Sequence, residues 1–129
     1  DVYKRQALRK GRIYMELRTE EWMKVYHKLA EQLKMIYQDH LKAVILYGSA
    51  ARGTATEDSD IDIMVLVDLS PDRLKDYEEK LCEVSTDFAL EYFKVFSIVD
   101  ISYQEYEEWK HILPFYQNVS REGVTLYAA

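Results

Sequence analysis

The chain has 129 residues, of which 48% are hydrophobic, 31% charged and 13% aromatic. This length suits one globular domain with its own core, and the low content of glycine and proline excludes long flexible linkers. Cys82 stands alone, which excludes an internal disulfide and a cysteine-rich zinc site, so we expect a reducing, cytoplasmic environment. Because no run of about 18 apolar residues occurs, we expect no membrane-spanning helix and no membrane partner.

Charge is distributed unevenly along the chain. The net charge is −6, but residues 1–14 carry +4, which leaves −10 on the remainder. Since Met15 is the first methionine, we expect residues 1–14 to be a non-native or disordered leader, with a basic nucleic-acid-binding arm as the alternative. We expect residues 15–129 to form a single domain that, being so acidic, makes no direct contact with nucleic acid.

The predicted elements begin with a helix over residues 20–40, where apolar side chains recur every three or four positions. Thr19 is expected to cap its first turn. A short, continuous apolar strand over residues 43–47 follows and leads into a small, polar segment over residues 48–59.

A second strand is predicted over residues 60–67, because apolar side chains alternate along it. Asp60 and Asp62 share one face of this strand, and the opposite face is aliphatic throughout. A long amphipathic helix over residues 71–92 comes next, with Ser70 as its cap and a proline at its first position.

The C-terminal part predicts a third strand over residues 94–101. Ser102 and Glu105 have the spacing of a capping box, which opens a short helix that ends before Pro114. Residues 123–127 are expected to form a last short strand. This order predicts an α/β (α+β) domain in which helices cover a small mixed sheet and the second and third strands run parallel.

The strongest chemical signal is Gly48-Ser49, ten intervening residues and then an Asp-x-Asp pair, Asp60 and Asp62. A glycine after a strand lets the backbone approach a ligand closely, and free N–H groups in a following helical turn favour an anion. The two carboxylates lie about 6.6 Å apart along one face and repel each other unless a cation lies between them. Magnesium binds a few carboxylates together with substrate phosphates, so the pattern fits metal-assisted nucleotidyl transfer.

These residues, within Gly-Ser-Ala-Ala-Arg-Gly and Ser-Asp-Ile-Asp, resemble the signature of the nucleotidyltransferase superfamily related to DNA polymerase β. The short form of the motif is similar to that of the minimal nucleotidyltransferases, the MNT group. The order of helices and strands extends the resemblance over about residues 20–127. The resemblance therefore implies the polymerase β-like nucleotidyltransferase fold.

The resemblance also implies roles for individual residues. Gly48 and Ser49 would hold the phosphates of a nucleoside triphosphate, expected to be ATP, and Arg52 is a further candidate phosphate contact. Asp60 and Asp62 would bind the catalytic Mg²⁺ of a two-metal site.

The family usually places a third carboxylate on the neighbouring strand, where it binds metal and acts as a base. By comparison with the family pattern, Ser97 occupies that position here, and Asp100 is the only acid on the strand. Side chains three residues apart on a regular strand point to opposite faces. Two alternatives stay open: Asp100 serves as the third catalytic carboxylate, or Ser97 holds a degenerate third position and catalysis is weakened or lost.

Larger relatives carry an added domain that binds the acceptor, and MNT proteins usually act with a small helical HEPN partner. The resemblance thus implies transfer of AMP from ATP to a hydroxyl of a partner protein, with this chain as the MNT antitoxin of a HEPN/MNT toxin–antitoxin pair. A homo-oligomer is a second possible source of the acceptor. The alternatives are a degenerate nucleotide- or partner-binding module and an enzyme that modifies a small molecule such as an antibiotic.

Overall fold

The computed structural model describes residues 19–129, so the predicted leader, residues 1–14, lies outside the described residues. One mixed sheet has the strand order β3-β2-β1-β4. Strands β2 and β3 are parallel, as predicted, and β1 is antiparallel to both of its neighbours. The strands are β1 (Leu41–Tyr47), β2 (Ile61–Val67), β3 (Phe96–Ser102) and β4 (Val124–Ala128).

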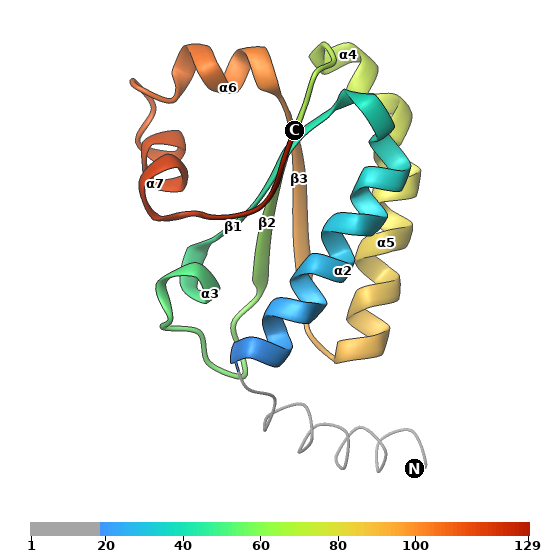
Figure 1. The fold of residues 1–129 in the computed structure, drawn as a ribbon, viewed down its shortest axis with the longest axis vertical. Coiled ribbons are helices and arrows are strands. Elements are labelled where there is room, and N and C mark those ends of the chain that lie inside the picture. Colours follow the sequence, from blue (N-terminus) through green and yellow to red (C-terminus); the bar gives the residue numbers. More distant parts are fainter. Residues whose placement is uncertain (1–18) are drawn as a thin grey trace.

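Helices cover both faces of the sheet, which confirms the predicted α/β architecture. The two long helices, α2 (Thr19–Tyr37) and α5 (Glu78–Tyr92), lie on one side, and α6 (Tyr103–Trp109) and α7 (Pro114–Glu122) lie on the other (Figure 1). The short segments are η1 (Gln38–His40), α3 (Gly48–Arg52), α4 (Pro71–Leu74) and η2 (Lys75–Tyr77).

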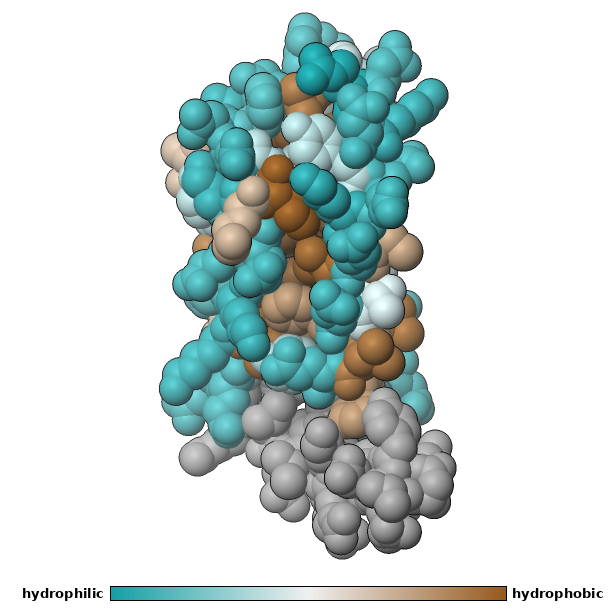
Figure 2. Space-filling view, turned by 90° about the vertical axis from the view of Figure 1, so that its right-hand side faces the viewer, coloured by the Kyte–Doolittle hydropathy of each residue, from teal (hydrophilic) through white to brown (hydrophobic). Residues whose placement is uncertain are grey.

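Alternation along β2 divides the core into two layers. One set of side chains packs against α2 and α5, and the other against α6 and α7, as the period of two predicts. The first set is Ile61, Ile63, Val65 and Val67, and the second includes Met64 and Leu66. From outside α2 and α5, hydrophilic side chains border a strip of hydrophobic ones (Figure 2).

Several predicted helix boundaries and helix caps are wrong. Thr19 lies inside α2 rather than capping it, and this helix ends at Tyr37 because Gln38 takes a positive φ of 53°. The single helix expected over residues 71–92 is divided by a 3₁₀ turn, η2. Ser70 does precede this helical segment, but its carbonyl oxygen, and not its hydroxyl, accepts hydrogen bonds there, from the N–H groups of Arg73 and Leu74.

The region around Pro114 contains a helix that was not predicted. The short helix after Ser102 ends at Trp109, before Pro114, as predicted, but Pro114 then begins α7, because the first turn of a helix tolerates a missing N–H group. Ser102 precedes α6 without a side-chain capping bond, since it is also the buried last residue of β3. No helix within residues 19–129 has the length and apolar character needed to cross a membrane.

Candidate active site

The turn after β1 brings the two halves of the motif together. The antiparallel pairing of β1 and β2 places Tyr47 opposite Asp62, and Gly48 follows directly as the first residue of α3. Gly48 has a φ of +72°, and a Cβ atom added there would collide with Oδ2 of Asp62. Only glycine therefore allows the carboxylate to lie against this turn.

The two aspartates are close enough to influence each other. Asp60 is exposed immediately before β2, and Asp62 is half-buried within it. Burial raises the pKa of Asp62, the negative charge of Asp60 raises it further, and the positive charge of Arg52 opposes the shift. Since the repulsion between the carboxylates is relieved by a cation between them, the pair favours cation binding.

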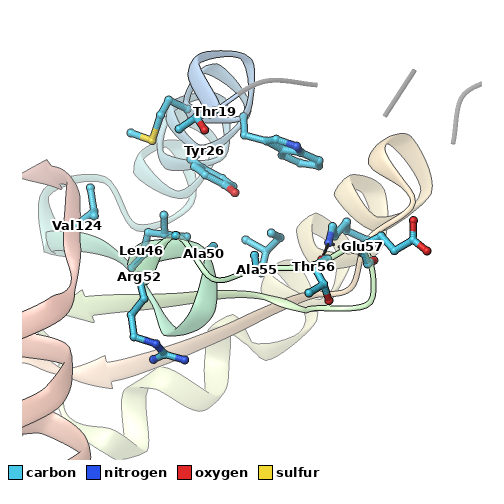
Figure 3. Close-up of a pocket in the computed structure, with 15 residues that line it drawn as sticks. Thr19, Tyr26, Leu46, Ala50, Arg52, Ala55, Thr56, Glu57 and Val124 are labelled. Carbon is cyan, nitrogen blue, oxygen red and sulfur yellow. Dashed lines mark hydrogen bonds between the residues drawn. The ribbon is translucent and has the colours of Figure 1, made fainter. Parts of the chain in front are cut away.

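The other predicted phosphate-binding residues lie on α3. Ser49 is its second residue, and its carbonyl oxygen accepts the N–H of Gly53 and, at 3.0 Å, that of Thr54. Arg52 is the last residue of α3, and its guanidinium extends away from Tyr26 (Figure 3). Gly48, Ser49 and Arg52 are thus collected within one turn of helix beside Asp62.

The register of the parallel strands separates the two candidates for the third position. Ser97 is paired with Asp62, so the two side chains lie on the same face of the sheet. Asp100 is paired with Val65 and lies on the opposite face, under α2 and α5. The first alternative, with Asp100 as the third carboxylate, therefore does not fit this structure, because the alternation of side chains along β3 points Asp100 away from Asp60 and Asp62.

Asp100 has a different set of partners. Its Oδ2 accepts a hydrogen bond of 2.9 Å from the hydroxyl of Tyr37, whose ring stacks on that of Tyr77 with centroids 4.8 Å apart. Burial raises the pKa of Asp100, and the hydrogen bond from Tyr37 opposes this shift. These contacts make Asp100 part of the packing between the sheet and α2.

The donor set fits a divalent cation that keeps further ligands from substrate or water. Among residues 19–129, no three His, Cys, Asp or Glu side chains gather as a metal site. Asp60 and Asp62 supply two carboxylates, and the Gly48 turn leaves room for the Asp62 carboxylate that a Cβ would fill. Magnesium is commonly held by one or two carboxylates plus substrate phosphates, so these residues fit it without a third acidic ligand.

A lysine that the motif does not contain holds the loop before β2. Lys94 Nζ donates hydrogen bonds to three backbone carbonyl oxygens, those of Thr56 at 2.7 Å, Ser59 at 3.0 Å and Glu57 at 3.2 Å. This contact could not be predicted from the sequence, because a lysine before a strand has no local pattern that shows where its ammonium group lies.

A cavity of about 650 Å³ lies behind α3, on the α2 side of the sheet. Tyr26 of α2 and Ala50 of α3 lie across it from each other (Figure 3). Asp60 and Asp62 do not line it, so it is distinct from the carboxylate pair. On the carboxylate side, Phe115 packs edge-on against Tyr47, with centroids 5.5 Å apart. Three residues shortly before it in the chain, Trp109, Ile112 and Leu113, have exposed apolar side chains.

A glycine turn that packs against Asp62, the second carboxylate of an Asp-x-Asp pair, in a small mixed sheet is typical of a phosphate-handling transferase of the α/β class. The profile of the family described as "Nucleotidyltransferase domain" matches residues 27–117. The chain belongs to this family, and it is a nucleotidyltransferase. The predicted family and enzyme class are thereby confirmed.

Curated relatives from Methanocaldococcus jannaschii are similar to most of the chain. One, named "Putative protein adenylyltransferase MJ0604", is 36% identical over 104 residues, which cover 81% of this chain and 96% of the relative. Another, "Putative protein adenylyltransferase MJ0141", is 33% identical over 72 residues, or 56% of this chain and 71% of the relative.

Solved structures share the fold. A structure described as "Crystal structure of the toxin-antitoxin with AMP-PNP" aligns with a TM-score of 0.51 and 21% identity, over 80% of this chain and 73% of that one. A mutant of the MntA-HpeT toxin-antitoxin aligns with the same TM-score of 0.51 and 20% identity, over the same shares of the two chains. These likenesses confirm the predicted nucleotidyltransferase fold, a small mixed sheet covered by helices.

Proposed function

We propose that this nucleotidyltransferase moves AMP from ATP to a hydroxyl group of a partner protein, with Mg²⁺ as cofactor. The observation that carries the proposal is the contact between the Gly48 turn and Asp62, which supports binding of a phosphate by this turn beside the two carboxylates. The names of the curated relatives support protein adenylylation, and the AMP-PNP in a toxin–antitoxin neighbour supports ATP as the donor. A HEPN-type toxin, with this chain as its MNT antitoxin, is the partner we propose.

Each site residue has a role in this proposal. Gly48 and Ser49 bind the triphosphate through backbone N–H groups and a hydroxyl, and Arg52 adds positive charge at the end of the same turn. Asp60 and Asp62 would hold the Mg²⁺, which when bound neutralises phosphate charge and polarises the reacting phosphoryl group.

The transfer itself is a substitution at phosphorus. The acceptor oxygen forms a bond to the α-phosphorus of ATP, the bond from that phosphorus to the β-phosphate oxygen breaks, and pyrophosphate leaves with its electron pair. The acceptor hydroxyl loses its proton in this step. Ser97 cannot take that proton efficiently, because a neutral serine hydroxyl is a weak base, so the proton passes to water or to a carboxylate of the pair.

The direct test uses ATP labelled at the α-phosphate, with Mg²⁺, the purified chain and a lysate of its source organism. We expect one labelled protein band, which is absent when the Asp60→Ala/Asp62→Ala variant replaces the wild type. Mass spectrometry of that band would identify the acceptor and the modified hydroxyl. A label that persists with the double variant would contradict the proposal.

Position 97 favours one alternative function. With Ser97 beside Asp62 and Asp100 on the other face, the site has two carboxylates rather than three. A chain that binds ATP in a Mg²⁺-dependent manner but labels no acceptor would be a nucleotide- or partner-binding module. The same labelling experiment, combined with an ATP-binding measurement, separates the two functions.

A further inference from the structure

The loop that leads into β2 is tied to the beginning of β3 by one side chain. A lysine ammonium group has three N–H donors, and the three carbonyl oxygens of Thr56, Glu57 and Ser59 accept one each from Lys94. Within the loop, the Thr56 N–H donates to Oγ of Ser59 at 2.9 Å, and the Ser59 N–H donates to the Thr56 carbonyl at 3.1 Å. The loop is therefore a closed turn with Lys94 bonded to its carbonyl groups.

The backbone is hydrogen-bonded to the segment before β3 at both neighbours of Asp60. The carbonyl of Ser59, just before it, accepts from Lys94 at 3.0 Å. The N–H of Ile61, just after it, donates to the carbonyl of Val95 at 2.9 Å. Lys94 and Val95, which are adjacent in the chain just before β3, thus bind the backbone on either side of Asp60.

The turn that presents Lys94 is itself unusual. Phe93 ends α5 in the left-handed conformation, with a φ of 57°, and its N–H donates to the carbonyl of Ala89 at 2.8 Å. For a residue other than glycine this conformation costs about 1 kcal/mol, so it persists because surrounding contacts favour it. The bonds from Lys94 to the loop are contacts of this kind.

We propose that Lys94 is a positioning residue for the carboxylate pair: it holds the backbone at Asp60 so that Asp60 and Asp62 bind one divalent cation together. This inference rests on the proposed function, which assigns these two carboxylates as the cation ligands. Lys94 does not touch the cation or the substrate in this role. Its effect reaches the site through the Ser59 carbonyl and the peptide group that follows.

The direction in which cation affinity changes when Lys94 is replaced distinguishes a positioning role from a purely electrostatic one. Lys94 carries a positive charge near Asp60, so its removal would, by charge alone, strengthen the binding of a cation. Loss of positioning has the opposite effect, because a mobile Asp60 must be ordered when the cation binds. Weaker cation binding in a variant without this charge therefore indicates lost positioning and not a lost charge.

The experiment measures the affinity of the full chain for Mn²⁺ alone, by electron paramagnetic resonance, at a temperature where thermal unfolding curves show every variant folded. We expect Lys94→Met to bind Mn²⁺ about tenfold more weakly, as is typical when a supporting group of a metal ligand is lost. Lys94→Arg, which keeps the charge and several donors, is expected to bind close to the wild type. Lys80→Met, a loss of the same charge at an exposed position of α5, is the matched control and is expected to change nothing.

The outcomes separate this inference from the proposed function. Equal or tighter Mn²⁺ binding by Lys94→Met, or an Arg variant as weak as the Met variant, would overturn the role of Lys94 and leave the carboxylate site intact. Wild-type binding that survives Asp60→Ala/Asp62→Ala would instead overturn the cation site itself. If Lys94→Met does not fold, Lys94→Gln replaces it, because its shorter amide side chain keeps neither the charge nor the reach to three carbonyl groups.

Discussion

Asp62 and Ser97 occupy the same position of the parallel ladder between β2 and β3, and both face the side of the sheet on which the Gly48 turn meets Asp62. A side chain at position 97 is thus the one on β3 that can join the carboxylate pair directly. Asp100, three residues further along, lies on the other face and bonds to Tyr37. In this chain the neighbouring strand therefore contributes a hydroxyl group, and not a carboxylate, beside Asp62.

Restoring the third carboxylate should strengthen the site. We expect Ser97→Asp to increase the rate of AMP transfer at least about tenfold, because a positioned base assists the loss of the acceptor proton. Labelled-ATP assays at saturating Mg²⁺ measure this rate. Ser97→Asn, of the same shape but without charge, is the control and should not increase it; equal rates for the two variants would show that position 97 does not reach the reaction.

The carboxylate pair should be essential for transfer. We expect Asp60→Ala and Asp62→Ala each to lower the transfer rate by more than about a hundredfold, because each removes a charged ligand of the cation. Asp58→Ala is the matched control, since Asp58 is an exposed carboxylate of the same loop. Comparable losses in all three variants would instead indicate a general effect of negative charge on this loop.

Gly48 and Gly53, the glycines with positive φ among residues 19–129, offer a test of close packing at the turn. Gly48 and Gly53 have φ values of +72° and +78°, but a Cβ would collide with Asp62 only at Gly48, and it would meet nothing within 4 Å at Gly53. Each substitution by alanine should cost about 1 kcal/mol of stability for the backbone conformation. Only Gly48→Ala should also displace the Asp62 carboxylate and abolish Mn²⁺ binding.

Denaturant unfolding together with Mn²⁺ titration separates these effects. If Gly53→Ala lost cation binding as completely as Gly48→Ala, backbone strain in the turn would account for both, and the contact with Asp62 would not be the cause.

Burial of Asp100 predicts a pH dependence of stability. Burial raises the pKa of Asp100 in the folded chain, so the folded state holds this proton more tightly than the unfolded state does. The contribution of Asp100 is therefore greatest below the ordinary carboxyl pKa, near pH 4, and it is lost as the pH rises through the raised value. Asp100→Asn, which cannot titrate and still accepts a bond from Tyr37, lacks this dependence.

Urea unfolding at pH 4 and pH 7 measures this difference. We expect the free energy of unfolding of Asp100→Asn, relative to wild type, to be higher at pH 7 than at pH 4. A difference that stays constant, or that reverses, would show that Asp100 is not destabilised by burial. Mn²⁺ binding should be the same in both proteins, because Asp100 lies on the face away from the carboxylate pair.

Much of the fold could be predicted from local patterns. The alternation in β2, the apolar stripe of the helices around it and the parallel arrangement of β2 and β3 are all confirmed. The predictions fail where one residue type is compatible with more than one local structure. Pro114 follows the end of α6, as predicted, but it also begins α7, which was not predicted, and Ser102 matches a capping pattern although it is a buried strand residue.

The candidate site likewise contains residues that could be predicted from local patterns and residues that could not. By itself, the sequence determined the glycine turn and the Asp60 and Asp62 pair, because their spacing and the period of two along a strand are properties of adjacent residues. Only the tertiary structure decided that Ser97 stands beside Asp62 and that Lys94 binds the loop before β2. Those relations join segments more than thirty residues apart, and they depend on strand register and side-chain packing, which no local pattern encodes.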